Sequence, residues 1–301
     1  MIVYNMINIL TFCNPSYNTI GTTNRSLSLI KQLYILYNSL KKKWINIDYD
    51  FYVVYNKNIK WSEEDSNYIK RFSDINWIAV NEGDVLSHQW ITRIPCFTHT
   101  LKRQGTHRLI LDCDMIALNE PTFDLSCDLQ AMYARDSTYS DAPKEALQYI
   151  INHLDLNINL DCYKTHKNAF VSYNLNPSIF PSNTFPHFNA GMVLLKEELC
   201  SKFGEIYKKW STDYLLKSTV GKYHIGNTGI FSQYVYSLIL VSLSDNFKPL
   251  HPGMNFLVKD ISINKFGREN IGILHYAGVS NSSRQDIYNS QVLPLLEEFS
   301  E

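Results

Sequence analysis

Long hydrophobic runs and an excess of charge of one sign are both missing from this 301-residue sequence, whose formal net charge is −1. Without a segment of about 20 apolar residues, no membrane-spanning helix is expected. Without a basic surface, nucleic acid and anionic lipid are poor partners. The one compact basic run, at residues 41–43, is typical of a solvated helix end, where cations meet the negative end of the helix dipole.

The cysteines also lack a pattern that would indicate a metal knuckle or a disulfide framework. The six cysteines include no Cys-x-x-Cys pair, and they are spread over a long chain. We therefore expect reduced thiols of the kind found in the cytoplasm. The first ten residues, MIVYNMINIL, have neither the basic start nor the long apolar segment of a signal peptide. The sequence thus predicts a soluble, cytoplasmic protein.

Apolar residues are plentiful, and in the first 118 residues they alternate between two periods. A hydrophobic content of 45% is ample for a packed core. Strands are expected at residues 7–12, 49–55, 75–80 and 109–111, and helices at 27–40, 61–72 and 91–101. Thr23 or Asn24 is the expected N-cap of the first helix. This alternation predicts an α/β fold with a mostly parallel central sheet flanked by helices.

The remaining sequence is less regular. Strands are expected at residues 129–134 and 188–195, and helices at 143–154, 199–214, 229–239 and 292–299, with Asp141 capping the first of these. Residues 155–187 carry little periodicity, which favours a substrate-side loop or lid. Because no repeat or linker is evident, we expect one domain over residues 1–301. It would divide into a first half at residues 1–118 and a second half at residues 119–301.

Two aspartates follow the apolar run of residues 109–111. Alternation along a strand would point Asp112 and Asp114 to the same side, and the run itself indicates a strand covered on both faces. Open α/β sheets bind ligands beyond the carboxyl ends of their strands, and paired carboxylates suit Mg²⁺ or Mn²⁺. A solvated strand end is the alternative, because Asp-x-Asp is common by chance.

Four further segments follow the Asp-x-Asp in a set order. They are FNAGMVLL at 188–195, SQYVYS at 232–237, LHPGMN at 250–255 and ILHYAG at 273–278. With these five segments in order, the chain resembles the GT-A nucleotide-sugar glycosyltransferases, most closely family 8, which contains glycogenin and bacterial lipooligosaccharide galactosyltransferases. No single motif decides this, but the resemblance extends over nearly the whole chain. It implies a single Rossmann-like GT-A domain with a nucleotide-binding half at residues 1–118 and a sugar and acceptor half at residues 119–301.

The resemblance implies a metal site. Asp112, Asp114 and His275 match the family's ligands, and a mixed carboxylate and imidazole set favours Mn²⁺ (or Mg²⁺) over Ca²⁺. The cation would bridge the donor diphosphate as a Lewis acid. For His275 taken alone, a hydrogen-bonded structural histidine is an equal alternative.

The resemblance also implies a donor-binding set. These residues are Cys13, Asn14, Tyr17, Arg93, Cys113, Asn189, Gly191, Gly278 and Arg284. Asn14 and Tyr17 would hydrogen-bond and stack on the base, although Asn14 also begins an ordinary Asn-Pro turn. Arg93 would lie near the phosphates. Asn189 and Gly191 would line the sugar and acceptor pocket, where a glycine allows close approach, or they mark a bulged strand.

Two positions depart from the family pattern. The usual Asp-Gln pair is absent: the register at Asn227 loses both residues, whereas the register at Gln233 keeps the glutamine and gives the better spacing to Asn255. We therefore favour Gln233, together with Asp136, as the catalytic candidates near the transferred sugar. Asn281 stands where the family has a lysine. Arg284 is close enough to grip the diphosphate with its planar fork instead.

The resemblance implies metal-dependent transfer of a hexose from a nucleoside diphosphate sugar, expected to be a UDP sugar, to a hydroxyl of a glycan, protein or lipid-linked acceptor, with retention. One alternative is an inactive relative that binds a nucleotide sugar or glycan, given the altered positions. Another is a phosphatase of the haloacid-dehalogenase type with Asp112 as nucleophile. That class has Thr or Val two residues after the second Asp, where this chain has Ile116, and an acidic pair late in the chain, which we do not find.

Overall fold

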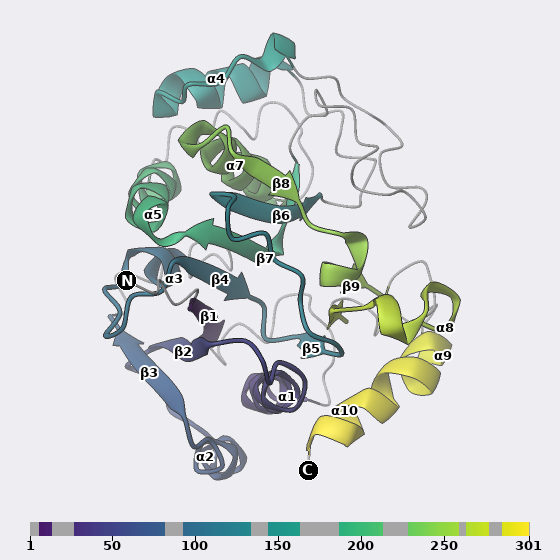
Figure 1. Ribbon diagram of the computed structural model, residues 1–301. Coiled ribbons are helices and arrows are strands. Elements are labelled where there is room, and N and C mark those ends of the chain that lie inside the picture. Colours follow the sequence, from purple (N-terminus) through teal and green to yellow (C-terminus); the bar gives the residue numbers. More distant parts are fainter. Residues whose placement is uncertain are drawn as a thin grey trace, which may run out of the picture.

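A central sheet organises the chain, of which a computed structural model describes residues 6–13, 27–81, 93–133, 144–162, 187–212, 228–258, 263–276 and 285–300. Its strand order is β3-β2-β1-β4-β7-β6-β8 (Figure 1). The strands are β1 Ile7–Cys13, β2 Tyr49–Asn56, β3 Ile75–Val80, β4 His107–Leu111, β6 Leu129–Tyr133, β7 Phe188–Lys196 and β8 Phe247–Pro249. β7 runs antiparallel to β4 and β6, while the other pairs are parallel. The expected mostly parallel sheet is confirmed.

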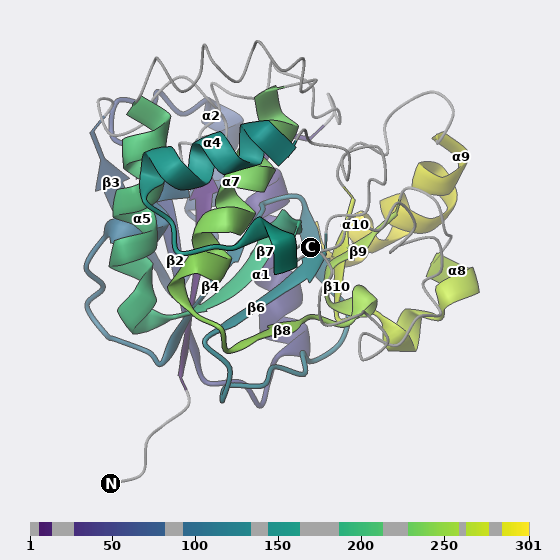
Figure 2. The same ribbon diagram turned by 90° about the horizontal axis from the view of Figure 1, so that it is seen from above.

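Helices cover both faces of this sheet. These helices are α1 Leu29–Lys43, α2 Glu63–Ile69, α3 Ile94–Thr98, α4 Lys144–Leu154, α5 Glu197–Thr212 and α7 Thr228–Leu243. Three further helices, α8 Ile263–Phe266, α9 Gln285–Ile287 and α10 Leu293–Ser300, pack in a separate apolar cluster with residues near 116, 256 and 274. α3, α4, α5 and α7 contribute to the core on one face, and α1 and α2 to the core on the other (Figures 1 and 2). The chain is thus a single α/β domain.

β4 lies at the centre of the sheet and is buried on both sides. Leu109 and Leu111 belong to the core beneath α1, whereas Ile110 belongs to the core beneath α5 and α7. This confirms the interpretation of the apolar run at 109–111. Since Thr11 of β1 pairs in parallel with Leu111, the chain leaves both strands at the same edge of the sheet.

A second, small sheet lies beside that edge. β5 Met115–Ala117 pairs antiparallel with β10 Ile273–His275, and β10 pairs in parallel with β9 Phe256–Leu257. The hydroxyl of Ser39 in α1 accepts a hydrogen bond from Ala117 N at 2.9 Å, which ties the small sheet to the large one. The chain segment after the two aspartates is thereby brought next to His275.

The ends of the first helices differ from the sequence prediction. α1 begins at Leu29, and its N-cap is Ser28, whose side chain accepts from Lys31 N at 3.2 Å. The expected caps, Thr23 and Asn24, lie outside the described residues. α2 begins at Glu63 rather than at 61 because a capping box of Ser62 and Asp65 starts it, and it ends at Ile69 rather than at 72. The basic run at 41–43 forms the last turn of α1, as predicted.

Other predictions concern features away from the sheet. None of the six cysteines, all of which lie in the described ranges, forms a disulfide. Within the part of the chain that the structure describes, no helix is both long and apolar enough to cross a membrane. The irregular segment contains a 3₁₀ turn at Leu160–Cys162, and its residues 163–186 lie outside the description, so a lid there stays a prediction. The division into halves at residue 118 is likewise a prediction.

Candidate metal centre

Asp112, Asp114 and His275 come together at the junction of the two sheets. Each offers one ligand atom, and these atoms lie within 4.8 Å of one another. His275 Nε2 is 3.4 Å from Asp114 Oδ1 and 3.8 Å from Asp112 Oδ2. The imidazole side chain is 5% exposed, and the carboxylates are 22% and 19% exposed. The imidazole is therefore buried, and the two carboxylates are mostly buried with one-fifth of their surface open to solvent.

The two aspartates converge for a different reason from the one expected. β4 ends at Leu111, so Asp112 and Asp114 lie in the bend beyond the strand rather than on one of its faces. Asp112 N donates to Gly191 O at 2.9 Å, and Tyr276 N donates to Asp114 O at 3.1 Å. Each aspartate is thus held by a different neighbour, one in β7 and the other just after β10.

A chain of amides orients His275. Asn189 Oδ1 accepts from Gly191 N at 2.8 Å, so its identity as the oxygen is set by a backbone donor. Asn255 Nδ2 donates to the same oxygen at 3.1 Å, which leaves Asn255 Oδ1 facing His275 Nδ1 at 3.0 Å. Because an amide oxygen only accepts, Nδ1 carries a proton, and Nε2 is the ring nitrogen that faces the carboxylates.

This arrangement fits a divalent cation. Among the described residues, His275 Nε2 is a buried polar atom without a hydrogen-bond partner, which proteins rarely leave unsatisfied. Burial raises the pKa of Asp112, and the nearby Asp114 adds to this effect while Arg93 opposes it. A bound cation would relieve both conditions. Two carboxylate oxygens and one imidazole nitrogen suit Mn²⁺ or Mg²⁺.

Gly191 is required by the closeness of β7 to these side chains. A Cβ at this position would lie 2.6 Å from His275 Cε1 and 2.9 Å from both Asp112 Oδ2 and Asn189 Oδ1. These distances are shorter than van der Waals contact allows, so any side chain here would displace a candidate ligand. The close approach expected for this glycine is present, and the neighbours that approach it are the candidate ligands.

Arg93 lies at the start of α3 and is turned toward the aspartates. Its Nη2 forms an ion pair with Asp112 Oδ1, and its Nη1 donates to Ala190 O in β7. The side chain is only 11% exposed. The structure thus pairs Arg93 with a candidate metal ligand, and its expected place near the donor phosphates stays a prediction.

Two buried cysteines, Cys13 and Cys113, lie at the bend that contains Asp112 and Asp114. Cys113 lies between the two aspartates, where its Sγ donates to Phe12 O at 3.3 Å and lies 3.2 Å from Thr11 Oγ1. Cys13 is fully buried, and burial raises the pKa of its thiol, with a further contribution from Cys113. Both thiols are core groups, so a role in donor binding would fall to their backbone.

Of the remaining predicted site residues, the structure describes Gln233 alone. Gln233 is partly exposed on α7, and its carbonyl accepts from Ser237 Oγ at 2.7 Å. Ser237 Oγ in turn accepts from Phe188 N at 2.8 Å. Ser237 thus contacts the first residue of β7, and Gln233 lies one helical turn before Ser237 in α7. The other candidates lie outside the described residues, and their roles stay predictions: Asn14, Tyr17, Asp136, Asn227, Gly278, Asn281 and Arg284.

Asn255 was missed as a site residue. The sequence used it only to choose between registers, although its position at the end of LHPGMN was a usable signal. It lies at the end of a short 3₁₀ helix, Pro252–Asn255, and is fully buried. A buried asparagine needs partners for its amide, and here the partners are Asn189 and His275.

Comparison with known proteins supports the fold. No family model and no curated protein sequence matches the chain. Among solved structures, the galactosyltransferase LgtC in complex with donor and acceptor sugar analogs superposes with a TM-score of 0.51 over 97% of this chain and 95% of that one, at 14% identity. The chain has the GT-A fold. Mouse xyloside xylosyltransferase 1 gives a TM-score of 0.48 at 11% identity, over 92% of this chain and 99% of that one. Identities this low speak to the fold alone.

Proposed function

We propose that this GT-A protein is a metal-dependent glycosyltransferase that moves a hexose from a UDP sugar to a hydroxyl acceptor with retention at the anomeric carbon. One observation carries the proposal: the buried, unpartnered Nε2 of His275 faces two carboxylates at the edge of the sheet where α/β folds bind ligands. A binding surface without chemistry has no need of such a group.

The chain's own residues prepare the site for a cation and a diphosphate. Asp112, Asp114 and His275 would hold the metal, which supplies positive charge to offset the charge of the departing nucleoside diphosphate. Asn255 Oδ1 accepts from Nδ1 of His275, which orients the ring so that Nε2 faces the two carboxylates. Gly191 leaves room for the three groups to meet.

The sugar side of the proposal rests on the family resemblance. Gln233 and Asp136 would stabilise positive charge on the transferred sugar, one by its amide dipole and the other by its carboxylate. Arg284 would hold the departing diphosphate together with the metal. Retention, the hexose and the uracil base are taken from the same resemblance.

An assay of donor turnover tests the proposal. Purified protein is incubated with UDP and GDP sugars in Mn²⁺ or EDTA, and released nucleoside diphosphate is measured for the wild type, Asp114→Asn and Asp124→Asn. Asp124 is the matched control because it is an exposed aspartate paired with Lys248 at 3.1 Å. We expect Mn²⁺-dependent release of UDP that Asp114→Asn lowers by on the order of 100-fold or more, as for loss of one electrostatic stabiliser. Asp124→Asn should match the wild type.

The same assay separates the alternatives. Binding of a donor without turnover, unaffected by added acceptor alcohols, would favour an inactive relative. Release of inorganic phosphate from aryl phosphates that depends on Asp112 would favour a phosphatase. The geometry disfavours that second outcome, because Asp112 is held in an ion pair with Arg93 rather than presented as a free nucleophile. The anomeric configuration of the product, read by NMR, tests retention.

A further inference from the structure

The Arg93 guanidinium occupies part of the candidate metal site. It pairs with Asp112 Oδ1, while Asp112 Oδ2 faces His275 at 3.8 Å. A second N–H of the guanidinium is fixed on Ala190 O, so the side chain is held from two directions. Asp112, one of the three candidate ligands, is therefore already paired with a positively charged side chain.

A divalent cation bound to Asp112 would lie beside this positive charge. Arg93 is 11% exposed and Asp112 is 22% exposed, so water screens their surroundings less than it screens a surface pair. Charges of the same sign that share one carboxylate repel each other, even when one contacts Oδ1 and the other Oδ2. Metal binding must therefore compete with the ion pair between Arg93 and Asp112.

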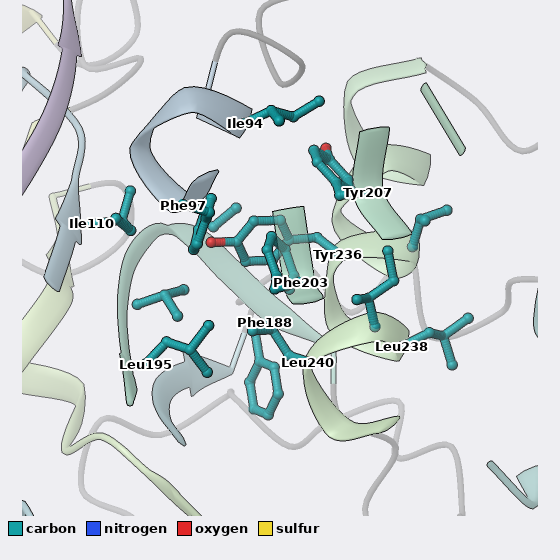
Figure 3. Packing of buried hydrophobic residues seen from close by; sticks show 14 of the residues in the cluster. Ile94, Phe97, Ile110, Phe188, Leu195, Phe203, Tyr207, Tyr236, Leu238 and Leu240 are labelled. Atoms are coloured by element: carbon teal, nitrogen blue, oxygen red, sulfur yellow. The ribbon is translucent and has the colours of Figure 1, made fainter. Parts of the chain in front are cut away.

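Two nearby hydroxyls offer the guanidinium another set of partners. Tyr207 on α5 and Tyr236 on α7 are buried, and within the described part of the chain their hydroxyl oxygens have no hydrogen-bond partner. The Tyr236 ring lies 6.1 Å from the ring of Phe97 in α3 and 5.6 Å from that of Tyr207. Burial raises the pKa of both phenols, and the positive charge of Arg93 opposes that rise. Figure 3 shows both tyrosines packed beside Ile94 and Phe97 of α3, the helix that Arg93 precedes.

We propose that Arg93 is a positioning residue that acts as an internal counter-cation: it competes with the metal for Asp112 and is released toward the tyrosine hydroxyls and the donor diphosphate when both ligands bind. The inference rests on the proposed metal site. Its consequence is that metal binds weakly alone and that nucleoside diphosphate and metal strengthen each other's binding.

Titration of the purified protein with Mn²⁺, followed by calorimetry or by EPR of free Mn²⁺, tests the competition without any turnover. The variants are Arg93→Gln, Arg93→Lys, Tyr236→Phe and Asp114→Asn, each with and without UDP. We expect Arg93→Gln to bind Mn²⁺ about tenfold more tightly than the wild type in the absence of UDP, within the usual range of coupling between sites. UDP should then strengthen Mn²⁺ binding less in this variant than in the wild type.

The other variants sharpen the result. Arg93→Lys keeps the charge and should stay near the wild-type affinity. Tyr236→Phe removes one of the alternative partners and should weaken Mn²⁺ binding. Arg108→Gln is the matched control, because Arg108 is also a buried arginine in an ion pair, with Glu197, but donates to Cys96 O and Phe97 O instead of the site. It should lower the melting temperature and leave Mn²⁺ affinity unchanged.

Failure of this inference is distinct from failure of the proposed function. If Asp114→Asn abolishes Mn²⁺ binding but Arg93→Gln binds no more tightly than the wild type, the counter-cation is overturned and the metal site stands. If Arg93→Gln does not fold, unchanged affinity in Tyr236→Phe overturns the inference. If the wild type binds no Mn²⁺, or Asp114→Asn binds it equally well, the metal site itself is wrong.

Discussion

At the scale of single residues, a backbone N–H decides the protonation pattern of the candidate metal centre. Gly191 N fixes the oxygen of Asn189, Asn189 fixes the amide of Asn255, and Asn255 fixes the proton on His275. Partners of this kind, behind the ligands, tune metal affinity because they set the tautomer and the ring orientation. The contact between Gly191 and Asn189 is local, but the other two join distant parts of the chain, since Asn255 is 66 residues from Asn189 and 20 from His275.

Replacement of Asn255 by alanine should weaken the metal centre without removing a ligand. The imidazole of His275 would lose the acceptor that holds its Nδ1 proton, and we expect Mn²⁺ affinity to fall by about 10- to 100-fold. Calorimetric titration measures this directly. Asn119→Ala is the matched control, since Asn119 donates to Arg268 O and Ile271 O away from the site, and it should leave Mn²⁺ affinity unchanged. Equal affinities in wild type and Asn255→Ala would refute the relay.

Replacement of Gly191 by alanine should cost both stability and metal binding. The new Cβ would lie 2.6 Å from His275 Cε1, and overpacking of this kind costs about 1–3 kcal/mol. Gly204→Ala provides a matched clash elsewhere, because its Cβ would lie 2.3 Å from Thr98 Cγ2. Urea unfolding and Mn²⁺ titration of both variants are the measurements. Only Gly191→Ala should lose Mn²⁺ affinity; a loss in both variants would make the effect one of general destabilisation.

The sequence predicted the candidate ligands but not how they are held. Asp112, Asp114 and His275 follow from recognisable motifs, because a motif preserves residue types at fixed positions. The ion pair of Arg93 with Asp112 joins two different segments, so nothing in either segment alone indicates it. Cys13 and Cys113 were assigned to donor binding, a role that stays a prediction, and the sequence did not indicate that their side chains are buried.

At the scale of secondary structure elements, strong periodicity gave reliable predictions. The strand expected at residues 75–80 is β3 residue for residue, and the helix expected at 143–154 is α4 apart from its first residue, which lies outside the described ranges. The strands β5, β9 and β10 were not predicted because two or three residues are too few to show a period. These short strands carry His275 to the aspartates, so the unpredicted elements are the ones that assemble the site.

The Ser237 hydroxyl links α7 to β7, and its removal should lower the stability of the protein. Ser237 Oγ accepts from the buried Phe188 N and donates to Gln233 O. Ser237→Ala leaves that N–H without a partner, which should destabilise the protein by about 1–3 kcal/mol. Ser242→Ala is the control, because its hydroxyl only donates to Ile239 O within the same helix at 2.7 Å. Chemical unfolding measures both, and equal effects would argue against the link.

At the scale of the whole molecule, the site forms where two sheets meet. The large sheet delivers the aspartates at the end of β4, and the small sheet delivers the histidine at the end of β10. The sequence predicted the large sheet, but not that β7 would insert antiparallel between β4 and β6. That insertion depends on pairing between strands that are far apart in the chain, and it places Gly191 against the metal centre.

The most direct test of the account is a thermal-shift measurement of nucleotide binding. Wild type and Asp114→Asn are melted with UDP, GDP or CMP, each in Mn²⁺ and in EDTA. A ligand at about 100 times its dissociation constant stabilises the folded state by about 2.7 kcal/mol. The account predicts that UDP raises the melting temperature of the wild type only with Mn²⁺, and that Asp114→Asn loses the effect. Equal stabilisation in EDTA, or no stabilisation by any nucleotide with metal, would contradict it.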